Sequence, residues 1–120
     1  HAYVRRQRQM CIRDSDYPDF IFPCAKAVAN DKESKGIILG GSGQGEAMAA
    51  NRIKGCRAAV FYNGPKEIVT LSREHNNANI LSLGARFMDE NDIFGVIELW
   101  LKESFKWGRH QRRIDKLDIL

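Results

Sequence analysis

Three short apolar runs alternate along this chain with segments that carry helix signals. The runs cover residues 36–39, 57–62 and 79–84, and their length is typical of strands buried on both faces. Capping, turn and spacing signals predict helices between and around them. Helices are expected near residues 16–29, 63–74, 93–103 and 109–117, and from a glycine-rich run at 40–46 to about residue 53. Asp89 can cap the helix at 93–103. This alternation predicts βαβ units and a parallel sheet.

The carboxyl ends of the predicted strands are the expected place for a ligand. Right-handed crossovers put the carboxyl ends of parallel strands along one edge of a sheet, and open α/β sheets bind ligands there. Three segments follow these strand ends: the glycine-rich run at 40–46, the pair Tyr62-Asn63, and residues 84–86. We therefore expect these three segments to lie side by side.

The glycine-rich run, G-G-S-G-Q-G-E at 40–46, carries the strongest signal for chemistry. Its glycines permit a sharp turn and close approach to a ligand, and the helix that follows offers unpaired N–H groups to an anion or an oxyanion. The run fails both the dinucleotide fingerprint and the P-loop at position 46, where glycine or lysine is required. Glu46 can serve as a base, or it can simply complement the dipole at a helix start.

Two further segments carry polar side chains suited to a sugar phosphate. His75 can transfer a proton near neutral pH and Asn76 can bind hydroxyl groups, although both residues also suit the end of a helix. Arg109 and Arg113 lie four residues apart on one helix face, which suits a phosphate group, and a solvated basic face is the alternative. Together with the glycine-rich run, they point to a phosphorylated, hydroxyl-bearing small molecule and to proton transfer.

Composition and charge narrow the class of protein. The 120 residues suffice for one domain, and most of the net charge of +4 lies in residues 1–15, where four arginines and one aspartate give +3. This segment has no hydrophobic period and one aromatic residue. We predict a disordered or non-native tail at 1–15 that binds no nucleic acid, and a domain at 16–120.

The lack of a recognisable targeting signal and the cysteine pattern predict a cytoplasmic protein that binds neither a membrane nor a metal. No stretch of the sequence is long and apolar enough to span a bilayer, and no signal peptide is recognisable. The three cysteines, Cys11, Cys24 and Cys56, form no C-x-x-C pair and are odd in number. That pattern suits a reducing compartment and suggests no disulfide framework.

From residue 16 onward the chain resembles the type B ribose-5-phosphate isomerases, a family that includes galactose-6-phosphate isomerase subunits. The matching motifs are D-Y-P-D at 16–19, G-I-I-L-G-G-S-G-Q-G at 36–45, A-A-N-R at 49–52, R-E-H-N-N-A-N at 73–79, L-G-A-R at 83–86 and G-R-H-Q-R-R at 108–113. The resemblance implies a three-layer α/β/α doubly wound parallel sheet, Rossmann-like. It also implies interconversion of ribose 5-phosphate and ribulose 5-phosphate in the pentose phosphate pathway, without a cofactor, by a homodimer or higher oligomer.

The resemblance implies a role for each candidate residue. Many members carry a cysteine base at the position of Gly40, and this chain resembles the branch in which the carboxylate matching Glu46 is the base. Ser42 would be catalytic beside it, and His75 would assist ring opening. The substrate-binding residues would be Tyr17, Gly41, Gly43, Gly45, Asn76, Arg86, Arg109 and Arg113, with the N–H groups of Ser42, Gly43 and Gly45 on the enediolate oxygen. His75 and Arg86 would lie across a subunit boundary from Glu46.

One departure from the family pattern concerns the N-terminus. Family members begin with a strand that carries S-D-H-A-G, then a helix and a second strand, and nothing before Asp16 matches these elements. We therefore expect a sheet that is incomplete at the N-terminus, with an unpaired edge beside residues 36–39, and a 120-residue chain that is inactive alone. Two other functions stay open: isomerisation of a six-carbon phosphate such as galactose 6-phosphate or allose 6-phosphate, and a non-catalytic module that binds a sugar phosphate or nucleotide.

Overall fold

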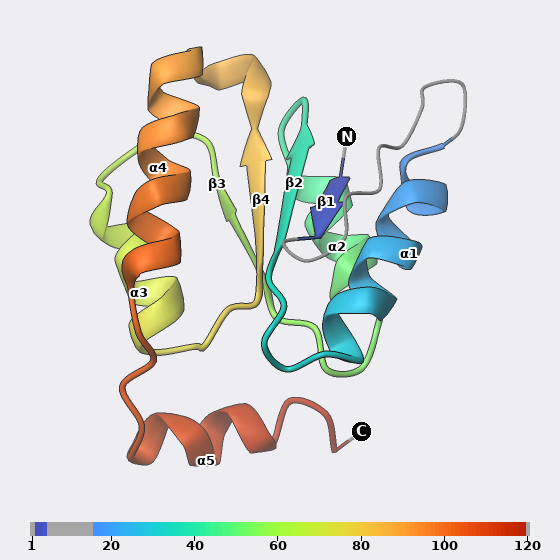
Figure 1. The fold of residues 1–120 in the computed structure, drawn as a ribbon, viewed down its shortest axis with the longest axis vertical. Coiled ribbons are helices and arrows are strands. Elements are labelled where there is room, and N and C mark those ends of the chain that lie inside the picture. The colour runs from blue at the N-terminus through green and yellow to red at the C-terminus, as the bar shows by residue number, and fades with distance from the viewer. Residues whose placement is uncertain (1, 5–15, 120) are drawn as a thin grey trace.

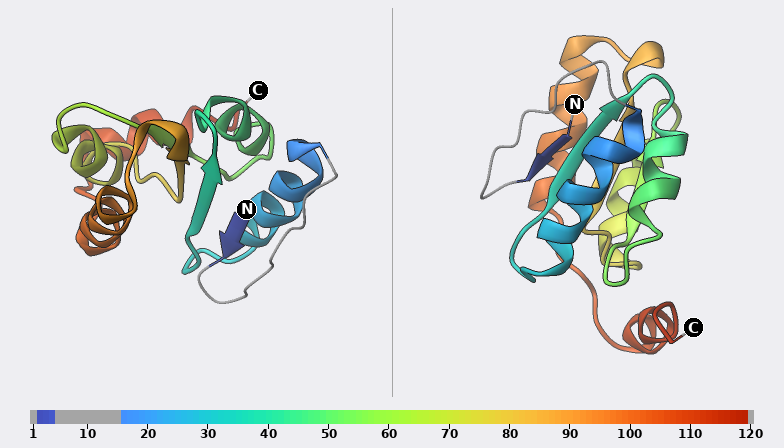
Figure 2. Two further views of the ribbon diagram at one scale, coloured as in Figure 1. Left: turned by 90° about the horizontal axis from the view of Figure 1, so that it is seen from above. Right: turned by 90° about the vertical axis from the view of Figure 1, so that its right-hand side faces the viewer.

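The chain folds as a sheet with helices on both faces (Figures 1 and 2). The computed structural model describes residues 2–4 and 16–119. In chain order, the elements are β1 (Ala2–Val4), α1 (Tyr17–Ala29), β2 (Gly36–Gly40), α2 (Gln44–Ala50), β3 (Ala58–Phe61), α3 (Glu67–Glu74), β4 (Ile80–Gly84), the short 3-10 helix η1 (Ala85–Phe87), α4 (Glu90–Lys102) and α5 (Arg109–Asp115). The predicted three-layer α/β/α fold is confirmed.

Strand β4 forms the centre of the parallel part of the sheet. The strand order is β1-β2-β4-β3, and both β2 and β3 run parallel to β4. Every residue of β4 is buried, as expected for a strand covered on both faces. The carboxyl ends of the three parallel strands meet at the upper edge in Figure 1, and the segments that follow them lie together there, as predicted.

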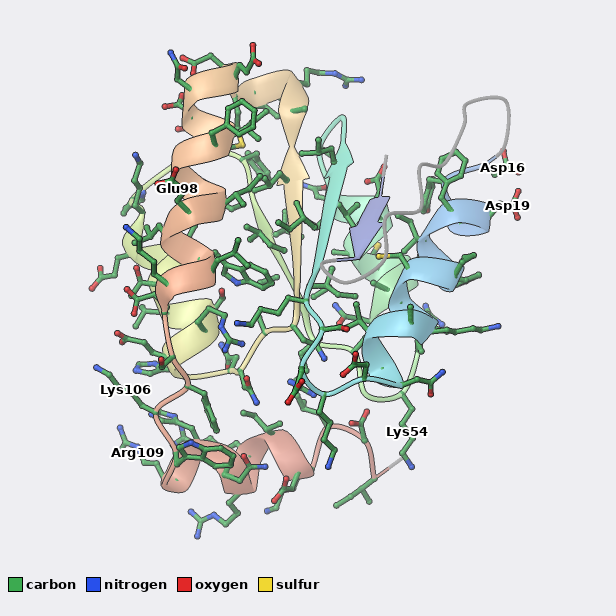
Figure 3. All side chains as sticks on the ribbon, in the orientation of Figure 1. Asp16, Asp19, Lys54, Glu98, Lys106 and Arg109 are labelled. Atoms are coloured by element: carbon green, nitrogen blue, oxygen red, sulfur yellow. The ribbon has the colours of Figure 1, made fainter. Side chains whose placement is uncertain are left out.

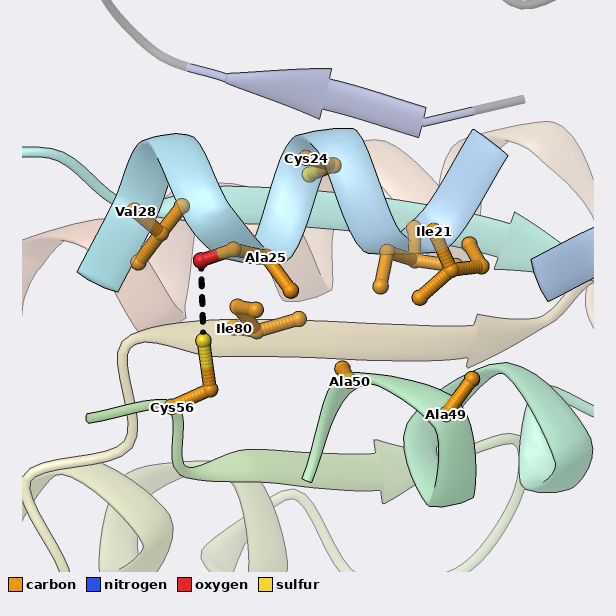
Figure 4. Close-up of a cluster of buried hydrophobic side chains, with 9 residues drawn as sticks. Ile21, Cys24, Ala25, Val28, Ala49, Ala50, Cys56 and Ile80 are labelled. Atoms are coloured by element: carbon orange, nitrogen blue, oxygen red, sulfur yellow. Dashed lines mark hydrogen bonds between the residues drawn. The ribbon is translucent and has the colours of Figure 1, made fainter. Parts of the chain in front are cut away.

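Each face of the sheet has its own apolar core. Helices α1 and α2 cover one face around Ile38 and Ile80, and α3 and α4 cover the other around Leu81 and Leu83. The α1 side chains in the first core follow helical spacing, so one stripe of the helix faces the sheet (Figure 4). They are Ile21, Cys24, Ala25 and Val28.

Cys56 has a structural place in the first core. Its Sγ atom donates a hydrogen bond to the Ala25 carbonyl over 3.0 Å (Figure 4). Burial raises the pKa of Cys56 to about 11, with smaller contributions from nearby charges. The thiol therefore stays protonated at neutral pH and joins α1 to the chain between α2 and β3.

The helix ends follow local capping. Asp89 caps α4 as predicted, because its carboxylate accepts from the Asp92 N–H at 2.8 Å. Helix α2 ends at Ala50, earlier than the predicted residue 53. The reason is Asn51, whose side-chain amide accepts from the Ala58 N–H at 2.7 Å and donates to the Ala58 carbonyl at 3.1 Å. The amide pairs with the start of β3 as a neighbouring strand would.

The sequence did not predict strand β1. Residues Ala2–Val4 pair antiparallel with β2 from Gly36 to Ile38, so the edge predicted to be unpaired has a partner at three positions. Three residues are too few to show a hydrophobic period, so this strand left no signal in the sequence. The predicted tail otherwise falls on residues 1 and 5–15, which lie outside the described residues.

Candidate active site

A glycine-rich loop, residues 41–43, joins β2 to α2 and leaves backbone N–H groups available to a ligand. Gly43 has a φ of 76°, a left-handed conformation that strains any other residue. Within the described part of the chain, no acceptor takes the N–H of Ser42, Gly43 or Gly45, whereas the Gln44 N–H donates to Ser42 Oγ at 3.3 Å. The loop and the helix start therefore form a surface for a negatively charged oxygen.

The carboxylate of Glu46 lies over Gly40, the last residue of β2. A Cβ atom at position 40 would collide with the carboxyl carbon and both carboxyl oxygens of Glu46. The half-buried carboxylate thus fills the space that a side chain at position 40 would take. Glycine at 40 and glutamate at 46 are matched sterically, and the carboxylate is turned back over the strand end.

Tyr17 and Arg86 complete this first group of side chains. The Tyr17 ring packs on Gly45, where a Cβ atom would lie 2.9 Å from the phenol oxygen. The Arg86 guanidinium lies over Gly41, where a Cβ atom would be 3.1 Å from Nη2, and the Arg86 N–H donates to the Gly41 carbonyl at 3.1 Å. A carboxylate, a guanidinium and a phenol thus surround the loop, contributed by α1, α2 and η1. We call this group the loop cluster: Tyr17, residues 40–46 and Arg86.

The position of Arg86 corrects one part of the sequence-based reading. The resemblance placed Arg86 across a subunit boundary from Glu46, but the structure puts it on the loop of its own chain. The cause is the turn η1, which follows β4 directly and lies beside the end of β2, because β2 and β4 are neighbours. Arg86 therefore belongs with Glu46.

The other predicted residues gather at the far end of the sheet. His75 follows the last turn of α3, and its ring stacks on His110 of α5 with 4.3 Å between ring centroids and 15° between planes. Partial loss of hydration, and then the charges of His75, Arg109 and Arg113, lower the pKa of His110. Neutral His110 can stack on His75 without charge repulsion. We call this group the helix-end cluster: His75, Asn76, Arg109, His110 and Arg113.

The two clusters are separated along the long axis of the molecule. The loop follows the upper strand ends, whereas α5 lies below the sheet (Figure 1). Figure 3 shows the same separation: Asp16 and Asp19, at the start of α1, lie at one end and Arg109 at the other. The molecule is 41 Å long in this direction, and no hydrogen bond or ion pair joins the clusters within residues 16–119. A single chain therefore does not bring all the predicted residues together.

A cavity of about 670 Å³ lies between the lower sheet edge and α5, and Arg57 and Arg73 line it. Arg73 is 7% exposed, and it donates to the Ala78 carbonyl at 2.6 Å and to the Glu103 carbonyl at 3.4 Å. Burial, and then the charge of Arg57, lowers the pKa of Arg73. The Glu103 carbonyl lies at the end of α4, and the Ala78 carbonyl lies in the segment between α3 and β4. Arg73 of α3 therefore joins these two segments, and its role is structural.

Two observations on the described residues concern membrane helices and metal sites. Across residues 2–4 and 16–119, no helix has both the length and the apolar character needed to cross a membrane. In the same residues, no three histidine, cysteine, aspartate or glutamate side chains are grouped so that they could hold a metal ion.

Comparison with known proteins identifies the family. Residues 6–117 match the family model described as Ribose/Galactose Isomerase. A Mycoplasma genitalium protein named probable ribose-5-phosphate isomerase B is 42% identical over 105 residues, which cover 87% of this chain and 68% of the relative. Ribose-5-phosphate isomerase B of Mycobacterium tuberculosis is 39% identical over 87% of this chain and 64% of the relative. This chain belongs to the ribose/galactose isomerase family.

Solved structures agree with this assignment. The crystal structure of ribose-5-phosphate isomerase B from Mycoplasma genitalium with bound ribulose-5-phosphate superposes with a TM-score of 0.81 at 38% identity. The match covers 92% of this chain and 72% of that one. A type B ribose 5-phosphate isomerase from Trypanosoma cruzi gives a TM-score of 0.80 at 37% identity, over 87% of this chain and 69% of that one. This chain spans about two thirds of the length of its curated relatives.

Proposed function

We propose that this chain catalyses the interconversion of ribose 5-phosphate and ribulose 5-phosphate through an enediolate, in the cytoplasm. The observation that carries the proposal is the Glu46 carboxylate over Gly40, beside loop N–H groups that have no acceptor among the described residues. An aldose–ketose shift needs a base next to an oxyanion site, and this loop offers both. The names of the relatives, one of them crystallised with ribulose-5-phosphate, support this choice of substrate.

The proposed reaction moves two protons and needs no cofactor. Glu46 takes the proton from C2 of the open-chain aldose and returns it to C1 of the enediolate. The N–H groups of Ser42, Gly43 and Gly45 stabilise the enediolate oxygen. The proton on O2 passes to O1. Ser42 is suited to this transfer because its Oγ accepts from the Gln44 N–H, and among the described residues no acceptor takes its own O–H.

The remaining roles fall to both clusters. His75 assists ring opening, Asn76 binds sugar hydroxyls, and Arg109 and Arg113 hold the phosphate. Tyr17, Gly41 and Arg86 line the site beside the loop. Because the two clusters lie at opposite ends of one chain, we propose a homodimer or higher oligomer in which each site combines the loop cluster of one copy with the helix-end cluster of another.

The first prediction tests the function itself. The protein should isomerise ribose 5-phosphate and leave unphosphorylated ribose unchanged, because the phosphate supplies binding energy for the reacting carbons. The assay measures ribulose 5-phosphate formed from ribose 5-phosphate, with a parallel reaction on unphosphorylated ribose as the control.

The same assay separates the competing functions. Faster turnover of galactose 6-phosphate or allose 6-phosphate than of ribose 5-phosphate would assign the protein to six-carbon substrates instead. Tight binding of ribose 5-phosphate or AMP with no isomerisation would identify a non-catalytic module.

The second prediction concerns the phosphate ligands on α5. Arg113→Ala should raise the Michaelis constant for ribose 5-phosphate by about 10–100-fold with little change in kcat, because a charge-assisted contact is lost in substrate and transition state alike. Arg113→Lys should restore only part of the affinity, since an ammonium cannot form the bidentate contact. Arg112→Ala is the matched control, because this exposed arginine lies on the same helix outside the i, i+4 pair. Equal effects at 112 and 113 would contradict a specific phosphate contact.

A further inference from the structure

The three residues of the glycine-rich loop are all in contact with the end of β4 and the turn that follows. The Gly41 carbonyl accepts from the Arg86 N–H at 3.1 Å, and the Gly43 carbonyl accepts from Ser82 Oγ at 2.6 Å. Between them, the Ser42 carbonyl oxygen packs so closely on Gly84 that a Cβ atom there would lie 2.6 Å away. The three carbonyls thus contact residues 86, 84 and 82 in turn.

This contact fixes the direction of the loop N–H groups. In a planar trans peptide, the N–H of one residue points opposite to the carbonyl of the residue before it. Carbonyls 41 and 42 face β4, so the N–H groups of Ser42 and Gly43 point away from β4. These are two of the N–H groups that have no acceptor in the described ranges. The end of β4 therefore sets the orientation of the oxyanion site.

Ser82 supplies the one side-chain hydrogen bond in this set of contacts. The other contacts come from the backbone of Arg86 and from the missing side chain of Gly84. Ser82 is 0% exposed, in a strand whose other residues are Ile80, Leu81, Leu83 and Gly84. A position among buried apolar residues normally holds an apolar side chain, because a buried hydroxyl without a partner is destabilising. The Ser82 hydroxyl is stabilised by its hydrogen bond to the carbonyl of Gly43, which is also buried.

The Gly43 carbonyl also accepts from the Ala47 N–H at 3.1 Å, the first hydrogen bond of α2. We infer that Ser82 is a positioning residue for the isomerase reaction: its hydroxyl holds the Gly43 carbonyl, directs the Gln44 N–H of the same peptide to Ser42 Oγ, and so anchors the loop whose Ser42 and Gly43 N–H groups face the enediolate. The expected effect of Ser82 on turnover rests on the proposed function. Its expected effect on the loop rests on the loop geometry alone. Ser82 acts through Gly43 and does not touch the reacting atoms. Its loss should weaken stabilisation of the enediolate more than binding of the substrate.

The test compares two buried serines that both donate to a backbone carbonyl. Ser82→Ala removes the bond to Gly43, and Ser72→Ala removes the bond from Ser72 Oγ to the Val69 carbonyl at 2.8 Å within α3, where the loop is not involved. Ser72 is 6% exposed, so both variants lose a buried hydroxyl. We expect Ser82→Ala to lower kcat by about 10–100-fold with KM changed less than about threefold, as for a small misplacement of a catalytic group. Ser72→Ala should keep kcat.

Two further measurements complete the design. Ser82→Thr keeps the hydroxyl and should restore most of kcat. Amide ¹⁵N–¹H spectra should show shifted signals for Ser42, Gly43 and Gln44 in Ser82→Ala, and faster hydrogen exchange for Gln44, whose N–H donates to Ser42 Oγ. The same amides should be unchanged in Ser72→Ala.

The outcomes separate this inference from the proposed function. Unchanged kcat and unchanged loop amides in Ser82→Ala would overturn the positioning role. An equal loss of kcat in Ser72→Ala and Ser82→Ala would also overturn it, because the effect would then reflect general destabilisation. If no sugar phosphate is isomerised by the wild-type protein, the proposed function fails, and the loop amides alone decide whether Ser82 orders the loop.

Discussion

Replacing Glu46 with glutamine is expected to lower turnover of ribose 5-phosphate by about 10²–10⁴-fold while leaving substrate binding almost unchanged. Glutamine keeps the shape of the side chain over Gly40 but cannot accept the C2 proton. No other carboxylate belongs to the loop cluster, and Gly40 offers no alternative base. The measurement is kcat for the variant, together with the dissociation constant of ribose 5-phosphate from calorimetry.

A matched variant distinguishes a base from a carboxylate that only complements a helix dipole. Glu90 lies in the first turn of α4, just as Glu46 lies in the first turn of α2. Glu90 is exposed, whereas Glu46 is half-buried. Neutralising either residue should cost at most about 1 kcal/mol of stability through the helix dipole. Glu90→Gln should therefore match Glu46→Gln in thermal stability and differ from it in turnover. Near-normal turnover in Glu46→Gln would reject Glu46 as the base.

The layer architecture was predictable because it depends on periodicity. Buried parallel strands appear as continuous apolar runs: residues 57–62 and 79–84 contain β3 and β4, and residues 36–39 match β2 except for its last residue, Gly40. The order of these strands makes their carboxyl ends adjacent, so the grouping of the glycine-rich run, Tyr62 and Arg86 followed from the fold class. The predicted cap at Asp89 was correct because capping is local.

Features that depend on contacts between distant segments were not predictable. The early end of α2 depends on Asn51 reaching Ala58, and the pairing of β1 depends on three residues without a pattern. A sequence also gives no direct sign that the Glu46 carboxylate fills the space beside Gly40. Ser82 did leave a signal, since a hydroxyl within an otherwise apolar strand at 80–84 needs a partner, but the partner is 39 residues away.

The separation of the two clusters leads to the last prediction, which concerns subunit exchange. In the proposed oligomer, each site takes Glu46 from one copy and His75 from another. Glu46→Gln and His75→Ala homodimers should each be nearly inactive, because every site lacks either the base or the ring-opening group. A mixed dimer contains one doubly altered site and one site with both native residues. After random exchange, activity should return to about a quarter of the wild-type level, because half of the dimers are mixed and each has one intact site.

The corrected place of Arg86 provides the control for this experiment. Arg86 and Glu46 lie in the same loop cluster, so an Arg86→Ala chain cannot restore the site that a Glu46→Gln chain lacks. Mixing these two variants should give no recovery, whereas mixing Glu46→Gln with His75→Ala should. Dimers carrying two different affinity tags, isolated on both, confirm that exchange has occurred before the assay. Recovery in neither pair, with mixed dimers isolated, would contradict a site shared between copies. Recovery in both mixtures would show instead that the Arg86 and the Glu46 of one active site come from different copies.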